Sequence, residues 1–287
     1  MKPAVISLVI VLLLLPLQPV SAGWDSKQAV VTLTAEQVDG ANDIEAAIIS
    51  ATAEGSRAGT VILDGRNGTF IFTDIDRSLN IFVSNLTLRG VNRAMIENCD
   101  DGLFFDSFPL KNILVEGIAF FCTGDGVDGW EIGSGFERVT LRDNLFRAGS
   151  NGINMGGTST DWLITGNVIE ADHDGIVIIG GKKVIITSNH ISGHVGISLQ
   201  GCTQSQVRKN TLHGSHQGVL LAQESWKNMV QMNTIWGVSH SGIALEPGVA
   251  NNRILTNRIA CAPDTSCLAV DATPEVAEMN TIAGNRP

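Results

Sequence analysis

Four histidines recur at one fixed position in successive segments of this sequence. Each stands two residues before a glycine that opens a short apolar run, and they are His173, His194, His216 and His240. A neutral histidine beside a carboxylate can act as a general base, and Asp172 and Asp174 flank His173. A row of imidazoles with an aspartate could instead bind Zn²⁺ or Cu²⁺, or the row could merely decorate a bend.

A second set of side chains recurs at the same sequence interval as the histidines. It consists of the residues three positions after successive asparagines, namely Arg147, Glu170, Ser192, His213 and Trp236. In a repeat protein, equivalent positions of successive repeats stand one above another. We therefore expect both sets to share one outer face.

Two catalytic chemistries fit this face. In one, His173 and Asp174 abstract a proton, and Arg147 or Arg208 lies near a substrate carboxylate or leaving group. In the other, Glu170 and Asp174 are the acid and base of a glycosidase, where a separation of roughly 6.5–9.5 Å implies inversion. The predicted catalytic set is His173, Asp174, Glu170, Arg147, Asp172, His194 and Arg208, and the predicted substrate contacts are His213, His216, Trp236 and His240.

A cluster of acidic residues forms a separate candidate site upstream. Asp101, Asp125 and Asp128, with Asp100 and Glu131 nearby, precede or begin short apolar runs. Carboxylate oxygens at this density could hold Ca²⁺, although aspartate beside glycine is also ordinary turn chemistry. Ca²⁺ is therefore the cofactor that this cluster predicts.

The segments that must position these residues repeat at regular intervals along the chain. Asparagines recur 21 to 24 residues apart, and so do glycines that open the phrase Gly-Ile-x-Ile/Leu. The asparagines are Asn144, Asn167, Asn189, Asn210, Asn233, Asn257 and Asn280, and the glycines are Gly129, Gly152, Gly175, Gly196, Gly218 and Gly242.

Each repeat contains three short runs in which apolar and polar residues alternate, as in Val139-Thr-Leu141. Alternation with turn residues between the runs predicts strands, and a repeat of this size predicts an all-β solenoid whose coils stack about 4.8 Å apart. The asparagine amides would then hydrogen-bond from coil to coil, and the glycines would stand where a bend needs a small residue.

The two ends of the chain differ from the repeats. Residues 1–22 have the form of a secretory signal peptide, so we expect a secreted or periplasmic product. Within residues 23–58, Ala29–Leu33 reads as a strand, and Asn42 to Glu45 has the form of a capping box that opens a helix. We expect this helix to cap the solenoid, which occupies residues 59–287, and we expect no second domain.

The repeat resembles the right-handed parallel β-helix of the pectin-lyase-like superfamily over about residues 60–280. That resemblance implies a carbohydrate-active protein: a lyase, epimerase or hydrolase, or a protein that binds glycans without turnover. Asp172-His173-Asp174-Gly175 is similar to the Asp-Pro-His-Asp motif of alginate epimerases, with Asp172 in place of proline. The chain has no tyrosine, which excludes the Tyr-dependent alginate enzymes as close models.

A second stretch resembles a hydrolase of the same superfamily. Gly193-His-Val-Gly-Ile-Ser198 is similar to the Gly-His-Gly-Ile-Ser strand of polygalacturonases. Val195 is an extra residue relative to that motif, and Asn151 stands where that family has an aspartate. The resemblance therefore does not extend to polygalacturonase activity.

Charge and cysteine content limit the partners and the compartment. The net charge of −10, from 19 Lys and Arg against 29 Asp and Glu, disfavours nucleic acid, and no later segment is long and apolar enough to span a membrane. We expect a monomer with a polysaccharide or oligosaccharide as partner. Cys261 and Cys267 bracket a short turn and should form a disulfide, Cys99 and Cys122 of adjacent coils could form another, and Cys202 has no evident mate.

Overall fold

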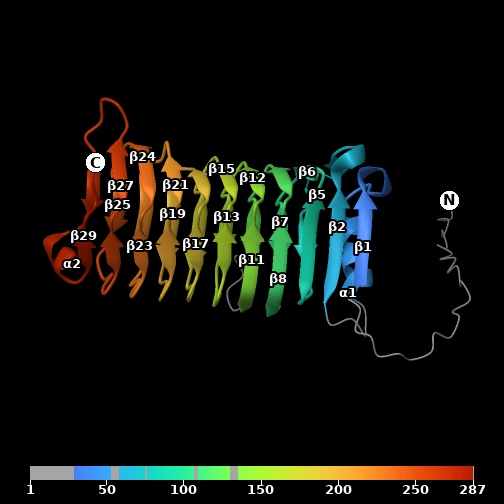
Figure 1. The fold of residues 1–287 in the computed structure, drawn as a ribbon, viewed down its shortest axis with the longest axis horizontal. Helices are drawn as coiled ribbons and strands as arrows, with labels where there is room; N and C mark the ends of the chain where they lie inside the picture. The colour runs from blue at the N-terminus through green and yellow to red at the C-terminus, as the bar shows by residue number, and fades with distance from the viewer. Residues whose placement is uncertain (1–28, 53–57, 75, 107–108, 130–134, 287) are drawn as a thin grey trace, which may run out of the picture.

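The computed structural model describes residues 29–52, 58–74, 76–106, 109–129 and 135–286. The predicted signal peptide, residues 1–22, lies outside the described residues. The described chain winds into a linear stack of coils, the parallel β-solenoid that the repeat predicts (Figure 1). Among these residues, no helix combines the length and the apolar character needed to cross a bilayer.

Three parallel sheets run the length of the described solenoid, and we name each by its first strand. The β1 sheet has 11 strands in the order β1 (Ala29–Thr34), β2 (Gly59–Asp64), β5 (Leu86–Val91), β8 (Leu110–Glu116), β11 (Phe136–Arg142), β14 (Leu163–Thr165), β17 (Ile185–Thr187), β20 (Gln206–Arg208), β23 (Met229–Gln231), β26 (Arg253–Leu255) and β29 (Thr281–Ala283).

The other two sheets have nine strands each within the described residues. The β3 sheet contains β3 (Phe70–Ile71), β6 (Met95–Cys99), β9 (Ala119–Cys122), β12 (Leu145–Ala148), β15 (Val168–Ala171), β18 (His190–Ser192), β21 (Thr211–His213), β24 (Thr234–Val238) and β27 (Arg258–Cys261). The β4 sheet contains β4 (Leu79–Ile81), β7 (Leu103–Phe105), β10 (Val127–Gly129), β13 (Ile153–Met155), β16 (Ile176–Ile179), β19 (Val195–Gln200), β22 (Gln217–Ala222), β25 (Ser241–Leu245) and β28 (Leu268–Asp271).

The core is a set of apolar columns that run along the solenoid axis. Because side chains alternate between the two faces of a strand, every second residue points inward and meets its equivalent in the next coil. One such column in the β3 sheet contains Phe146, Ile169, Ile191, Leu212, Ile235 and Ile259, all at most 2% exposed. Phe120 stacks on Phe146 with ring centroids 5.2 Å apart.

The asparagine column is a ladder of buried amides. In each step, the backbone N–H and the Nδ2 of one asparagine donate to the Oδ1 of the next, as for Asn144 to Asn167 at 3.0 and 3.1 Å. The Nδ2 also donates to a backbone carbonyl, that of Val115 in this step, at 3.0 Å. The prediction of a coil-to-coil amide ladder is confirmed.

The end of this ladder corrects one predicted member. Asn257 donates to Asn285, and Asn280 instead accepts from Asn252 in a second ladder at another bend. The second ladder begins at Ser205, whose N–H donates to Asn228. The sequence count failed here because helix α2 (Pro274–Glu278) lengthens the last coil.

The positions of the glycine column require glycine because the backbones of adjacent coils approach each other closely there. A Cβ added to Gly175 would lie 2.5 Å from the carbonyl oxygen of Gly196, and one added to Gly152 would lie 2.5 Å from that of Gly175. The column continues upstream through Gly126, where a Cβ would lie 2.4 Å from the Gly152 oxygen. The prediction that Gly129 belongs to this column is wrong, because Gly129 pairs with Met155 within the β4 sheet.

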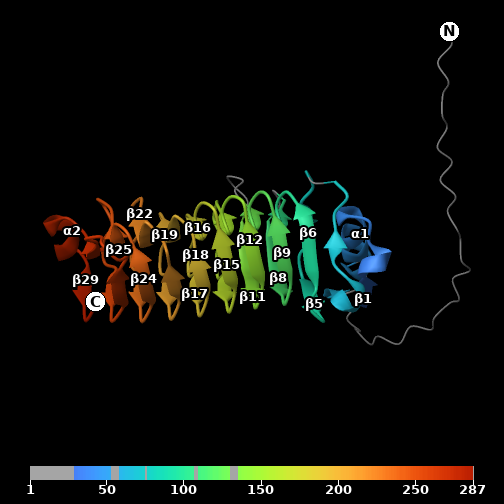
Figure 2. The same ribbon diagram turned by 90° about the horizontal axis from the view of Figure 1, so that it is seen from above.

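Helix α1 (Ala41–Thr52) confirms the predicted helix but not its predicted start. It buries Ile44 and Ile48 completely. The capping box is wrong, because Asn42 lies inside the helix and accepts from Arg77, while Glu45 accepts from the N–H of Asn80 at 3.0 Å. The helix lies beside the first strands of the solenoid (Figure 2).

Both predicted disulfides are present. Cys99 and Cys122 join the adjacent strands β6 and β9, and Cys261 and Cys267 close the turn after β27. Cys202 is buried with a free thiol, and burial raises the pKa of that thiol to about 12. This thiol is therefore inert at neutral pH.

Candidate functional site

The outer face of the β3 sheet carries the second predicted row. Direct strand partners place its members one above another, from Phe121 through Arg147, Glu170, Ser192 and His213 to Trp236. The strands have an inward residue at the position before each of them, so the side chains of the row face solvent. The prediction that Arg147, Glu170, Ser192, His213 and Trp236 align is confirmed, and Phe121 extends their row by one coil.

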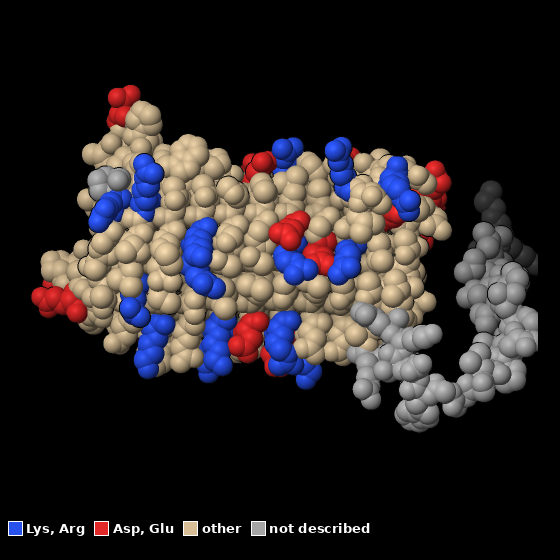
Figure 3. Space-filling model, viewed as in Figure 1, with Lys and Arg blue, Asp and Glu red and all other residues tan. Residues whose placement is uncertain are grey.

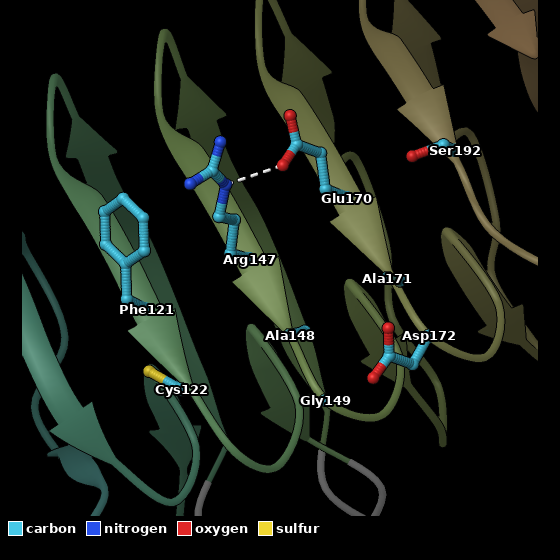
Figure 4. A pocket seen from close by; sticks show the side chains of 9 residues that line it. All are labelled: Phe121, Cys122, Arg147, Ala148, Gly149, Glu170, Ala171, Asp172 and Ser192. Carbon is cyan, nitrogen blue, oxygen red and sulfur yellow. Dashed lines mark hydrogen bonds and ion pairs between the residues drawn. The ribbon is translucent and has the colours of Figure 1, made fainter.

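The row has a charged pair between two aromatic ends. Arg147 Nε donates to Glu170 Oε2 at 2.6 Å, and the Arg147 guanidinium lies 5.2 Å from the centre of the Phe121 ring. At the other end, the rings of His213 and Trp236 stack with centroids 5.0 Å apart, and Trp236 is 48% exposed. Figure 4 shows Phe121, Arg147, Glu170 and Ser192 side by side on successive strands.

Two hollows join to form a groove beside this row. One has a volume of about 540 Å³ and is lined by Phe121, Arg147, Glu170 and Asp172 among others. The next, of about 460 Å³, contains His194, His213 and His216. The two hollows share Ala171, Asp172 and Ser192, so we call the whole the β3 groove, defined by Phe121, Arg147, Glu170, Asp172, Ser192, His194, His213 and His216.

Two members of the predicted histidine row, His194 and His216, line the groove, and His240 continues their stack beyond it. The rings of His194 and His216 stack with centroids 5.1 Å apart, and those of His216 and His240 with centroids 4.9 Å apart. The N–H of His194 donates to the carbonyl of His173, so His173 is in the same backbone column. Among the described residues, however, the His173 ring takes no part in the stack.

The surroundings of the stacked rings affect their protonation. Burial lowers the pKa of His216, and the neighbouring His194 and His240 lower it further. The Nδ1 of His216 lies 3.1 Å from Ser239 Oγ, and His240 Nε2 lies 3.6 Å from Asp271 Oδ2. The lowered pKa makes His216, the middle ring of the stack, harder to protonate than an isolated histidine.

The predicted base Asp174 belongs to a structural ladder. Its Oδ1 accepts from the N–H of Val195 at 3.0 Å, and its own N–H donates to Asn151. Asn151 in turn donates to Asp125, and Asp125 donates to Asp101. Sequence reasoning missed this ladder, although its signal is present: each of its four residues directly precedes a glycine of the glycine column.

This ladder also accounts for much of the predicted calcium cluster. Both oxygens of Asp125 accept protein hydrogen bonds, and Asp101 accepts from Asp125 and from Ser78. Burial raises the pKa of Asp101. Asp128 lies apart on β10, and Glu131 lies outside the described residues. Within the described ranges, no three His, Cys, Asp or Glu side chains converge as metal ligands would.

Arg208 does not lie with the groove. It stands on β20 in the β1 sheet, whereas the groove follows the β3 sheet and its turns. The two alternatives for the cation near a substrate carboxylate or leaving group, Arg147 and Arg208, therefore lie on different sheets. Two members of the predicted catalytic set, Glu170 and Asp172, line the same hollow.

The fold defines the class of this protein. It resembles the Dettilon tailspike protein with a TM-score of 0.56 at 15% identity, over 90% of this chain and 61% of that one. It also resembles the GH136 lacto-N-biosidase from Eubacterium ramulus, with a TM-score of 0.55 at 12% identity over 79% of this chain and 49% of that one. The chain has the fold of a right-handed parallel β-helix protein.

A third solved structure extends this comparison. A mutant of DFA-IIIase from Arthrobacter chlorophenolicus A6, in complex with DFA-III, matches with a TM-score of 0.50 at 12% identity, over 83% of this chain and 82% of that one. By contrast, this chain spans about three fifths of the tailspike and half of the lacto-N-biosidase. At such identities the likeness concerns the fold alone.

The particular family is shown by the sequence itself. Residues 139–286 match the family model of NosD, described as periplasmic copper-binding protein, and the chain belongs to that family. The two disulfides fit a location outside the cytoplasm. The search of curated proteins found no match.

The histidine stack does not fit a shared copper ion. A metal lies in the plane of each imidazole that binds it, along the nitrogen lone pair. The planes of His194 and His216 are parallel within 7°, and those of His216 and His240 within 9°. One ion cannot lie in the planes of two rings that are stacked face to face. Neighbouring histidines of this stack therefore cannot share one copper ion.

Proposed function

We propose that this chain is an exported carbohydrate-active protein that binds a glycan in the β3 groove and hydrolyses it. The observation that carries this proposal is the presence of two carboxylates, Glu170 and Asp172, in one groove that has an aromatic residue at one end and a stacked ring pair beside the other. The resemblance of the fold to carbohydrate-active proteins supports it as analogy only.

The aromatic side chains suit sugar rings. The C–H faces of a sugar are apolar and pack on an exposed aromatic ring, while its hydroxyls need hydrogen-bond partners at the sides. Phe121, which is half-buried with the Arg147 guanidinium over its ring, supplies an aromatic side chain at one end of the groove, and the exposed Trp236, stacked on His213, supplies one near the other. Ser192, His194 and Asp172 supply polar groups between them.

The carboxylates suit glycoside hydrolysis. Glu170 is on β15 and Asp172 directly follows that strand, and both side chains line the same hollow. Glycosidases use two carboxyl groups that lie within roughly 10 Å of each other. In this proposal Glu170 and Asp172 share the acid and base roles, and Arg147 places a positive charge beside Glu170.

A second candidate function is glycan binding without turnover. The ion pair at 2.6 Å between Arg147 and Glu170 favours it, because the guanidinium occupies a carboxylate oxygen that a catalytic acid or base would need for the substrate. Elimination or epimerisation by His173 and Asp174 has less support, because Asp174 is occupied by the Val195 N–H.

A panel of neutral and acidic oligosaccharides tests these functions. We expect new reducing ends without the ultraviolet absorbance of unsaturated sugars, and we expect Asp172→Asn and Glu170→Gln each to lower the rate at least 100-fold while binding persists. The control is Asp143→Asn, which changes an exposed carboxylate at the turn after β11. It should leave the rate unchanged.

The other outcomes separate the alternatives. Binding without any product would favour the non-catalytic function. Unsaturated products that disappear in His173→Ala would favour elimination. Hydrolysis that is unaffected by both carboxylate variants would remove the groove from consideration as the active site.

A further inference from the structure

The coils from Ile176 to Arg258 carry a charge opposite to that of the whole chain. From Ile176 to Arg258, a segment that is described throughout, there are only two acids, Glu224 and Glu246. The seven bases of the same segment are Lys182, Lys183, Arg208, Lys209, Lys227, Arg253 and Arg258. Figure 3 views the face of the β1 sheet and shows Lys and Arg over these coils, with few acids among them. This segment is cationic in a protein with a net charge of −10.

The coil geometry places these bases at the two edges of a flat strip. Lys182 and Trp226 share one column at the bend before the strands, with Lys183 and Lys227 directly after them. Arg208 is the last residue of β20, and Lys209 follows it at the opposite bend. All of these side chains are exposed except that of Arg208, which is half-buried.

The strip between the edges is largely uncharged. Its outward row runs from Leu163 through Ile185 and Gln206 to Met229, and ends at Arg253. Two exposed apolar side chains flank it, Trp226 at 40% and Met232 at 45% exposure. Lys227 Nζ lies 4.1 Å from the centre of the Trp226 ring.

We propose that this face docks on an anionic lipid bilayer surface. Clustered lysines are attracted to acidic headgroups, and tryptophan beside lysine is the combination that settles at the interface between headgroups and water. A flat sheet face with bases along both edges meets a planar surface over its whole width. A single acidic polysaccharide chain would follow only one of the two edges.

Within the face, acidic groups do not cancel this charge. Asp161 reaches Lys183 at 4.0 Å on the side of the preceding coil. Glu224 lies at the bend after β22, two residues before Trp226, and Glu246 directly follows β25, so these two acids reduce but do not cancel the charge of the bases. The proposal is independent of the β3 groove, which lies on a different sheet.

Vesicle sedimentation tests the docking. The purified protein is mixed with vesicles of phosphatidylcholine alone or with roughly a third of phosphatidylglycerol. We expect binding only to the anionic vesicles, weakened by salt because the interaction is between exposed charges. Lys183→Ala and Lys227→Ala should each lower the partition coefficient about fivefold, since a lysine near an anionic surface contributes about 1 kcal/mol.

Lys111→Ala provides the matched control. Lys111 is exposed at the same bend, in the column of Glu137 and Lys182, but outside the cationic segment. It should leave vesicle binding unchanged, as should Asp172→Asn in the groove. The proposal is overturned if anionic vesicles do not bind, if Lys111→Ala weakens binding as much as Lys183→Ala does, or if soluble polygalacturonate binds this face while vesicles do not.

Discussion

At the scale of single residues, buried amides hold neighbouring coils together. Each inner asparagine of the main ladder is at most 2% exposed, yet its N–H and its Nδ2 both have partners. An unpaired buried polar group costs about 1–3 kcal/mol, so each rung satisfies groups that the bend would otherwise leave unpaired. The ladder therefore determines where each coil turns.

Removing one rung tests this role. In Asn189→Ala, the N–H and Nδ2 of Asn167 lose their acceptor, and the carbonyl of Ile164 loses its donor. We expect the free energy of unfolding to fall by about 2–4 kcal/mol, as measured by urea denaturation. Gln206→Ala, a half-buried outward residue of the next coil, should change it by less than about 0.5 kcal/mol. Equal effects would contradict the ladder's role.

The histidine stack predicts a pH dependence of stability. The pKa of His216 is lowered by burial and by His194 and His240, so the unfolded chain binds this proton more readily than the folded one. The resulting stability is present above the unfolded pKa of about 6.5 and is lost as the pH falls below it. Between pH 7 and pH 5, the Tm of the wild type should fall further than that of His216→Gln. Parallel profiles would show that the stacked rings are not coupled to folding.

At the scale of elements, the first helix meets an open sheet edge. Glu45 of α1 accepts from the N–H and from the Nδ2 of Asn80 on β4, the first strand of its sheet, at 3.0 and 2.7 Å. A free strand edge can pair with other chains, and a side chain that takes its N–H groups prevents this. We propose on this basis that α1 caps the solenoid.

A substitution in α1 tests the capping proposal. Glu45→Ala leaves the Asn80 N–H without its acceptor and removes the 3.4 Å ion pair with Arg77. We expect a loss of about 1–3 kcal/mol in unfolding free energy and a new concentration-dependent oligomer in light scattering. Glu36→Ala, on an exposed glutamate of the preceding turn, should behave like the wild type. A monomeric and fully stable Glu45→Ala protein would argue against capping.

The sequence predicts elements well where coils have equal length. The asparagine and glycine intervals locate the strands of the regular coils, and alternation within them correctly places Glu170 and Trp236 on one outer row. Counting fails where a coil changes length: the spacing of Asn257 and Asn285 is 28 residues, against 21 to 24 elsewhere. It also fails where aspartate replaces asparagine in a ladder, as for Asp174, because a structural carboxylate then looks like a catalytic one.

At the scale of the whole molecule, the solenoid separates its surfaces by sheet. The β3 sheet presents the groove with its carboxylates and aromatic rings, and the β1 sheet presents the cationic strip. Because each sheet runs along the whole axis, a ligand on one face does not compete with a partner on the other. Sequence periodicity predicted the rows, whereas the groove could not be predicted, since its depth depends on how the turns between β15 and β16 stand relative to the strands.

The most direct test of the account is a crystal structure of the protein with the oligosaccharide that binds it best. The account predicts sugar rings along the β3 groove, with one ring packed against Phe121 or Trp236 and a glycosidic oxygen within hydrogen-bond distance of Glu170 or Asp172. A sugar bound instead over the β4 sheet or the cationic strip, with the groove empty, would contradict it.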